Sequence, residues 1–79
     1  MTRSEVRRLL RSHRVMLRLE VPTTDEWTYQ VRLDGVTVGE VTRRMAGWFF
    51  VTPLPDGGST INGPWKKQRT AVRELLRTL

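Results

Sequence analysis

The stretch Trp27-Thr28-Tyr29-Gln30-Val31-Arg32-Leu33-Asp34-Gly35-Val36-Thr37-Val38 decides how this chain folds. Up to Asp34-Gly35, large apolar residues alternate with polar ones, a period of two that is typical of a strand with one buried face. Asp34-Gly35 favours a tight type I′ turn, because both central residues of that turn take positive φ. The pattern predicts a β-hairpin with strands over residues 27–34 and 36–43.

Further strands are predicted on both sides of this hairpin. Residues 15–21 are expected to form one, because Leu17, Leu19 and Val21 alternate with charged residues. Residues 48–52 are expected to form another. This second strand is apolar on both faces, so it needs cover on both sides or a partner molecule. Its apolar residues are Trp48, Phe49, Phe50 and Val51.

Two segments interrupt the regular strand pattern. Val41 breaks the alternation, and Gly39 is the position at which a β-bulge is expected to absorb the slip. Residues 53–60 are rich in proline and glycine and predict a loop. After that loop, Ile61 is expected to pair only briefly with a neighbouring strand.

A short helix is predicted over residues 3–13. Thr2 and Glu5 have the spacing of a capping box, in which a hydroxyl and a carboxylate satisfy backbone groups at the helix start. Val6 and Leu9 follow at helical spacing, while arginines occupy the other faces of the helix.

A second helix is predicted over residues 64–78. Pro64 suits a first helical position, with Asn62 or Gly63 as the cap. Apolar residues at helical spacing predict a continuous buried stripe along this helix. Its basic residues fall on the opposite, solvated face.

These elements predict one α+β domain over residues 1–79. An antiparallel sheet of three to four strands is expected to pack in two layers against an N-terminal and a C-terminal helix, in the order α-β-β-β-(β)-α. If both helices lie on one face of the sheet, their basic outer faces form a single patch. The expected core consists of Trp27, Tyr29, Val31, Leu33, Trp48, Phe50, Val72, Leu75 and Leu76.

Composition excludes several classes of protein. The chain has 79 residues and no cysteine, so neither disulfides nor thiolate metal sites can stabilise it. Its single histidine, His13, cannot build a histidine-based metal site, and no cofactor is expected. No apolar stretch approaches the roughly 20 residues that span a bilayer. The N-terminus lacks the apolar core of a signal peptide, so we expect a cytoplasmic protein without membrane association.

The charges lie in three blocks. Residues 1–21 hold six arginines against two glutamates, a net of +4, and residues 63–79 also carry +4. Residues 22–62 carry −2. Because the two basic blocks coincide with the predicted helices, a polyanion is expected to dock on the helices rather than on the sheet.

This distribution predicts a small, non-catalytic module that binds DNA or RNA, or that regulates nucleic acid, through its phosphates and with weak sequence specificity. Twelve of the fourteen basic residues are arginine, whose planar fork of donors suits phosphate oxygens. Codon bias in a GC-rich genome explains an arginine excess equally well. The residues expected to contact phosphates are Arg7, Arg8, Arg11, Lys66, Lys67, Arg69 and Arg73.

Catalysis is not expected. General acid–base chemistry needs titratable groups that converge in a cleft. His13 lies at the end of a predicted helix, where a histidine more often complements the helix dipole. Asp25 and Glu26 are neighbours in a loop and favour a solvated turn. The run from Asp56 to Ser59 lacks the lysine and the spacing of a phosphate-binding loop.

A protein-interaction module is the alternative. It would be a small inhibitor or adaptor that docks on an acidic partner protein. This alternative rests on the apolar strand from Trp48 to Val51, of which one face can lack cover in so small a domain. The same strand could form the seam of a homodimer.

Two families resemble this chain. The order helix–strand–strand–strand–helix, with Lys66-Lys67 near the start of the last helix and Ala71 soon after, resembles the double-stranded-RNA-binding domain. That resemblance implies lysines that touch phosphates across a duplex groove and a first helix that reads the minor groove.

Residues 27–79 resemble the three-stranded-sheet-plus-helix DNA-binding modules at the N-terminus of tyrosine recombinases. The residues that carry this likeness are the Gly35 hairpin, Gly39-Glu40-Val41, Gly47-Trp48 and the helix from Arg69 to Leu79. The resemblance implies that the sheet reads a DNA major groove. The residues available for that role are Arg32, Arg43 and Arg44.

Overall fold

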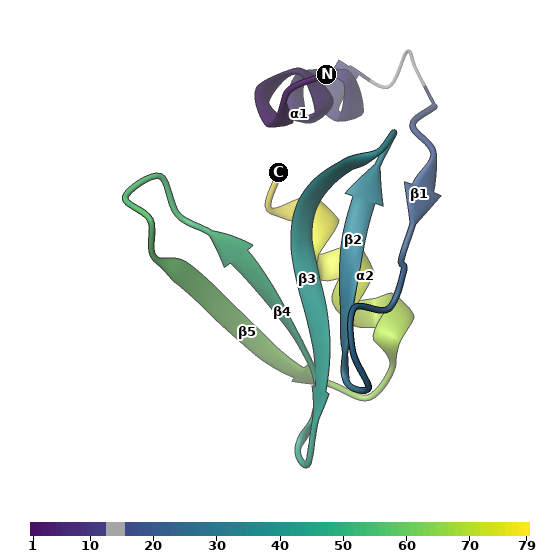
Figure 1. Cartoon of the computed structure of the whole chain (residues 1–79), viewed down its shortest axis with the longest axis vertical. Helices are drawn as coiled ribbons and strands as arrows, with labels where there is room; N and C mark the ends of the chain where they lie inside the picture. The colour runs from purple at the N-terminus through teal and green to yellow at the C-terminus, as the bar shows by residue number, and fades with distance from the viewer. Residues whose placement is uncertain (13–15) are drawn as a thin grey trace.

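The computed structural model describes residues 1–12 and 16–79 and confirms the predicted α+β class, with five antiparallel strands between two helices (Figure 1). The strands are adjacent in chain order, β1-β2-β3-β4-β5, and α2 packs chiefly on β3, β4 and β5. No helix in the described part of the chain is long and apolar enough to cross a membrane. The elements are α1 Arg3–Ser12, β1 Leu19–Glu20, β2 Thr28–Leu33, β3 Val36–Arg44, β4 Gly47–Pro53, β5 Ser59–Trp65 and α2 Gln68–Arg77.

The β2–β3 hairpin has the geometry that its sequence predicts. Leu33 pairs with Val36 across the turn, and both turn residues take positive φ, 48° at Asp34 and 81° at Gly35. Such a turn matches the right-handed twist of the two strands that it joins. The local pattern therefore determines the register of the central hairpin.

A β-bulge lies beside Gly39, where the break in alternation predicted it. Val31 pairs with Gly39 and Arg32 pairs with Thr37, which leaves Val38 as the extra residue of β3. Gly39 has a second role, because a Cβ atom at this position would lie 2.6 Å from Cδ1 of Leu75. Glycine thus allows α2 to pack directly on the backbone of β3.

The predicted start of the C-terminal helix is wrong. Pro64 belongs to β5 rather than to a first helical turn, and α2 begins only at Gln68 with Lys67 as its N-cap. Trp65 stacks on Phe50 with ring centroids 5.4 Å apart. That packing and the pairing of β5 with β4 outweigh the local preference of proline for a helix start. The predicted loop shrinks to a turn, in which the N–H of Leu54 donates to the carbonyl of Gly58 at 2.8 Å.

The core lies between α1, α2 and one face of the sheet. Its buried residues are Val6, Val31, Leu33, Val38, Val41, Phe50, Ala71, Val72, Leu75 and Leu79. Five of the nine predicted core residues are among them. Tyr29, Trp48 and Leu76 pack against this core but are only partly buried.

The prediction that Trp27 is a core residue is wrong, because half of its surface is exposed. Trp27 lies just before β2, whereas α2 packs chiefly on the strands farther along the sheet, β3 to β5. The helix therefore leaves this end of β2 without cover.

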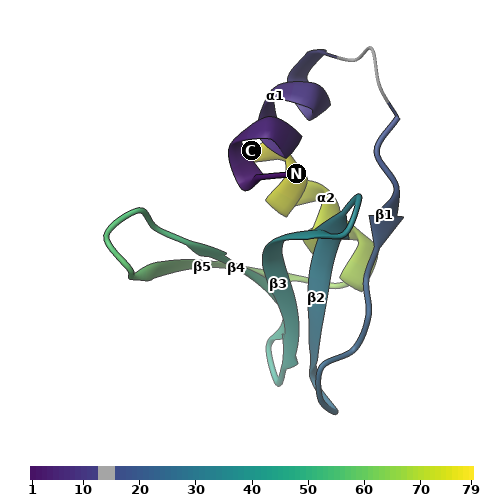
Figure 2. The ribbon, with the colours of Figure 1, turned by 45° about the horizontal axis from the view of Figure 1, so that its top comes forward.

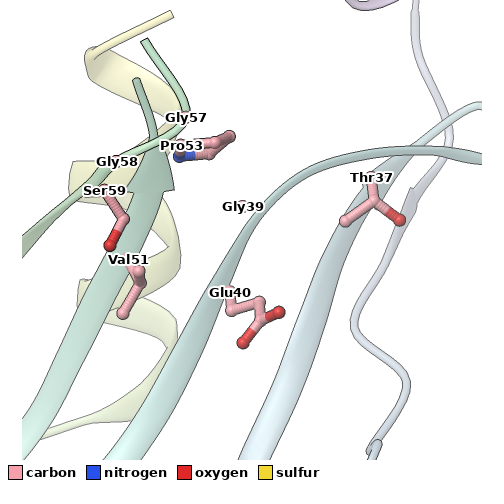
Figure 3. Close-up of a pocket in the computed structure, with 8 residues that line it drawn as sticks. All are labelled: Thr37, Gly39, Glu40, Val51, Pro53, Gly57, Gly58 and Ser59. Carbon is pink, nitrogen blue, oxygen red and sulfur yellow. The ribbon is translucent and has the colours of Figure 1, made fainter. Parts of the chain in front are cut away.

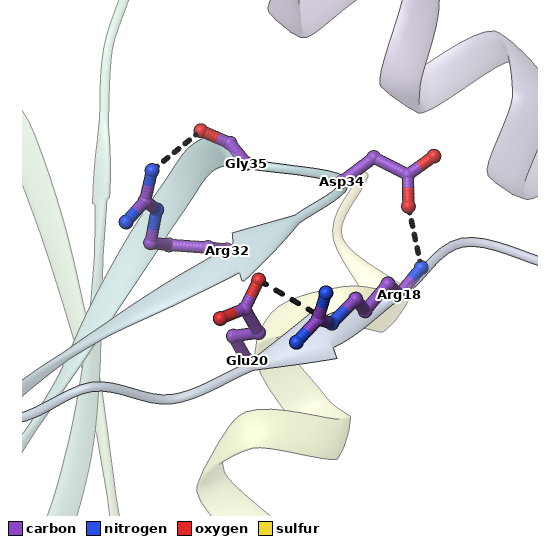
Figure 4. A network of polar contacts seen from close by, with 5 residues as sticks. All are labelled: Arg18, Glu20, Arg32, Asp34 and Gly35. Atoms are coloured by element: carbon purple, nitrogen blue, oxygen red, sulfur yellow. Dashed lines mark hydrogen bonds and ion pairs between the residues drawn. The ribbon is translucent and has the colours of Figure 1, made fainter.

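The first strand is shorter than residues 15–21, which were expected to form it. Only Leu19 and Glu20 pair with β2, and residues 13–15 lie outside the described part of the chain. Polar contacts fasten this edge (Figure 4). The N–H of Arg18 donates to Oδ1 of Asp34 at 2.6 Å, while Nη2 of Arg32 donates to the carbonyl of Gly35 at 2.9 Å within the β2–β3 hairpin. Backbone hydrogen bonds of 2.9 Å, from Asp34 to Arg18 and from Gln30 to Pro22, continue the contact with β2 on both sides of β1.

The N-terminal helix forms as predicted over its described residues, while the predicted position of His13 lies outside them. The hydroxyl of Thr2 accepts the N–H of Glu5 at 3.2 Å, which is the first of the two bonds of a capping box, and the carboxylate of Glu5 accepts from that hydroxyl at 3.3 Å. Nε of Arg11 donates to the carbonyl of Leu79 at 2.8 Å. This contact fixes α1 at the C-terminal end of α2, and both views place the C-terminus beside α1 (Figures 1 and 2).

Candidate nucleic-acid interface

The seven basic residues predicted to contact phosphates lie on both helices and on the connection into α2. Three lie on α1, two lie between β5 and α2, and two lie on α2. All are exposed, and neither of the two ion pairs within residues 1–12 and 16–79 involves any of them. Their positive charge is therefore not neutralised by a carboxylate of the described chain. They are Arg7, Arg8, Arg11, Lys66, Lys67, Arg69 and Arg73.

A row of arginines follows an exposed face of α2, on the side where Arg69 and Arg73 line a hollow with Leu19 and Val21. Arg69 and Arg73 are four residues apart, and Arg77 continues the row by another four. Residues at this spacing lie on one face of a helix, about 6 Å apart along its axis. Arg77 was not among the predicted residues, although its spacing could have identified it. Its Nη1 lies 3.4 Å from Oε1 of Glu74, so part of its charge is neutralised.

The start of α2 adds to this positive potential. Lys67 is the N-cap residue and makes no side-chain capping hydrogen bond, and the first turn contains no acidic residue. The first backbone N–H groups of a helix lack partners within the helix and carry its positive dipole end. Lys66, Lys67 and Arg69 therefore surround a helix end that favours an anion over another cation.

Arg11 of α1 and the lysine pair Lys66-Lys67 lie at opposite ends of α2. Arg11 binds the carbonyl of Leu79 beyond the C-terminal end of α2, whereas Lys66 and Lys67 precede its first residue. The ten residues of α2 span roughly 15 Å. The basic residues, which were expected to form a single patch, are thus spread along α2 and on to α1. We call these basic residues, together with Arg77, the basic stripe.

The arginines of the strands do not join this stripe as a group. Arg32 is partly buried and binds the carbonyl of Gly35. Arg43 and Arg44 are exposed neighbours in β3, so their side chains leave opposite faces of the sheet. The guanidinium carbon of Arg43 lies 6.0 Å from the ring centroid of Trp27.

The apolar strand β4 has one covered and one open face. Phe50 is buried, and Trp48 packs on Tyr29 with ring centroids 5.7 Å apart. Phe49 and Val51 alternate with these residues, so they occupy the other face, where they are partly exposed. The alternative interface from Trp48 to Val51 therefore divides between the two faces of the sheet.

A hollow of about 330 Å³ opens where β3 and β4 diverge (Figure 3). Glu40 is the one charged residue in its lining, and the glycine turn between β4 and β5 forms its far wall. A carboxylate at this position disfavours a polyanion. Among the described residues, no group of three or more His, Cys, Asp and Glu side chains is placed to hold a metal ion.

Comparison of the chain with protein-family models, with curated proteins and with solved structures gives no match.

Proposed function

We propose that this protein is a small module that binds nucleic acid through its phosphates and carries no catalytic site. The observation that supports this most is that all seven predicted basic residues are exposed and that neither ion pair within residues 1–12 and 16–79 involves them. Arg11 also holds α1 at the end of α2 through its bond to Leu79, whereas the other six are exposed cations suited to an external polyanion. Lysines and arginines that neutralise phosphates release condensed counterions, and this release drives binding.

The length of the basic stripe fits a nucleic-acid backbone. Neighbours in the arginine row lie about 6 Å apart along α2, so Arg69, Arg73 and Arg77 can each meet a different phosphate of one strand. The uncapped start of α2 offers backbone N–H groups to one further phosphate oxygen. Because these contacts reach phosphates rather than base edges, weak sequence specificity is expected.

A second candidate function is docking on an acidic partner protein. It is favoured by the open face of β4, where Val51 pairs with Ile61 of β5 and Ile61 is 52% exposed. Phe49 adds an aromatic ring to the same face. Exposed apolar side chains that adjoin one another are typical of an interface.

One titration separates these two functions. A short, labelled random-sequence duplex, as DNA and as RNA, is titrated with the protein at about 50 mM salt, and fluorescence anisotropy measures the affinity. We expect binding to both duplexes, unchanged in Phe49→Glu, because Phe49 lies away from the basic stripe. The absence of binding to either duplex would overturn the proposal. It would leave docking on an acidic partner as the remaining candidate. Loss of duplex binding through Phe49→Glu in a folded protein would instead place the nucleic-acid contact on the open face of β4 and contradict the basic stripe.

A further inference from the structure

An exposed tryptophan marks the end of the sheet near the start of α2. Trp27, Arg43, Arg44 and Met45 line a hollow of about 420 Å³. Half of the surface of Trp27 is exposed, and Met45 is fully exposed. Large apolar side chains contribute to stability by burial, so folding alone does not account for two of them at one surface.

The position of Trp27 is fixed by its backbone. Its N–H donates to Oδ1 of Asp25 at 2.8 Å, and the N–H of Thr28 donates to the same oxygen at 2.9 Å. From the other side, the N–H of Arg43 donates to the carbonyl of Trp27 at 2.8 Å. Hydrogen bonds therefore hold both the N–H and the carbonyl of Trp27, while its indole is half exposed to solvent. Such preorganisation lowers the entropy cost of binding a ligand.

Two arginines lie beside this ring, and two exposed acids, Asp25 and Glu26, precede it in the chain. The guanidinium carbon of Arg43 lies 6.0 Å from the ring centroid, within the range of a cation–π contact. Arg43 and Arg44 take part in neither ion pair of the described chain. Of the two acids in the adjoining loop, Asp25 is engaged in the turn and Glu26 is exposed.

The basic stripe begins close to the same hollow. Arg44 pairs with Gly47, and a Cβ atom at Gly47 would lie 2.6 Å from the carbonyl oxygen of Trp65. Lys66 follows Trp65 directly, so it lies beside the β3–β4 turn. Trp27 adjoins the same turn from the side of β2. The exposed ring of Trp27 thus lies near Lys66, the first residue of the basic stripe at the start of α2.

A ligand that fits this surface has a flat π face and negative charges on a flexible backbone. An unpaired nucleobase with its flanking phosphates has both properties. A base within a duplex does not offer its face, because its neighbours in the stack cover it. Aromatic side chains beside a positive groove are the usual means by which proteins hold single strands.

We propose that Trp27 stacks on an unpaired base of a single-stranded nucleic acid, while Arg43, Arg44 and Lys66 contact the adjacent phosphates. This inference rests on the proposed nucleic-acid binding and adds a site for single-stranded segments, such as an overhang or a loop. The basic stripe holds phosphates of any strand, and Trp27 distinguishes unpaired from paired bases.

Two variants of Trp27 test this site. Trp27→Leu removes the π face but keeps an apolar side chain, and Trp27→Phe retains a smaller ring. The affinities for single-stranded oligothymidine and for a duplex are measured side by side. We expect Trp27→Leu to weaken single-strand binding about tenfold or more, with partial recovery in Trp27→Phe and no change for the duplex. Leu54→Ala, at an exposed site in the distant β4–β5 turn, is the control and should change neither affinity.

Tryptophan fluorescence gives an independent readout. Oligothymidine should quench the emission of the wild-type protein, and Trp27→Phe should bind with most of this quenching lost. Unchanged single-strand affinity in Trp27→Leu would overturn the inference and leave the proposed function intact. An equal loss for single strand and duplex would also overturn it, because Trp27 would then support the fold. Failure of the wild-type protein to bind either ligand would remove the proposed function as well.

Discussion

Reversal of three charges along α2, in Lys67→Glu/Arg69→Glu/Arg73→Glu, is expected to weaken duplex binding more than about a hundredfold at low salt. Each neutralised phosphate contributes a term to the affinity that grows as the salt concentration falls. The triple variant removes three such contacts and replaces them with repulsion. All three side chains are exposed, so the fold should persist. Fluorescence anisotropy at about 50 mM salt measures the loss, and circular dichroism verifies the fold.

A matched pair of single variants controls for net charge. Arg73→Gln and Arg18→Gln each remove one positive charge from an exposed arginine. Arg18 lies at the β1 edge, where its Nε is 3.7 Å from Oε1 of Glu20 (Figure 4). We expect only Arg73→Gln to reduce the affinity clearly. Equal losses in both variants would mean that net charge, rather than the basic stripe, determines binding.

The largest expected effect on stability comes from Leu75→Ala. Leu75 is fully buried at the contact between α2 and β3, where the absence of a side chain at Gly39 makes room for it. Truncation of a buried leucine costs about 2–5 kcal/mol in the free energy of unfolding. Native domains have only about 5–15 kcal/mol in total, so this variant should lose a large part of its free energy of unfolding.

Urea unfolding, followed by tryptophan fluorescence, measures this loss. Leu54→Ala is the control, because Leu54 is 40% exposed and lies in the β4–β5 turn. We expect a large shift of the unfolding midpoint for Leu75→Ala and a small one for Leu54→Ala. Equal midpoints would contradict the assignment of Leu75 to the centre of the core.

Features that depend on neighbouring residues could be predicted from the sequence. Alternation from Tyr29 to Leu33 identified β2, and Asp34-Gly35 identified the turn that follows it, because both signals act within a few residues. The Thr2–Glu5 capping box fixed the start of α1 for the same reason. Spacing on a helix likewise placed the arginines of α2 on one exposed face.

Features that depend on distant packing could not be predicted. The stacking of Trp65 on Phe50 draws Pro64 into β5. The residues next to Trp65 and Phe50 in the sequence give no sign of that contact. The exposure of Trp27 follows from where α2 lies, since alternation alone assigns Trp27 to the buried face. The Arg11–Leu79 contact places α1 beside the C-terminal end of α2. It joins residues far apart in the sequence, so no local pattern predicts it.

The salt dependence of duplex binding tests the proposed phosphate contacts most directly. The dissociation constant is measured between about 50 and 200 mM salt with the wild-type protein. About six phosphate contacts predict a slope near −5 when the logarithm of affinity is plotted against that of salt, a loss of about a thousandfold over this range. A slope near zero, or no binding at the lowest salt concentration, would contradict nucleic-acid binding through the basic stripe.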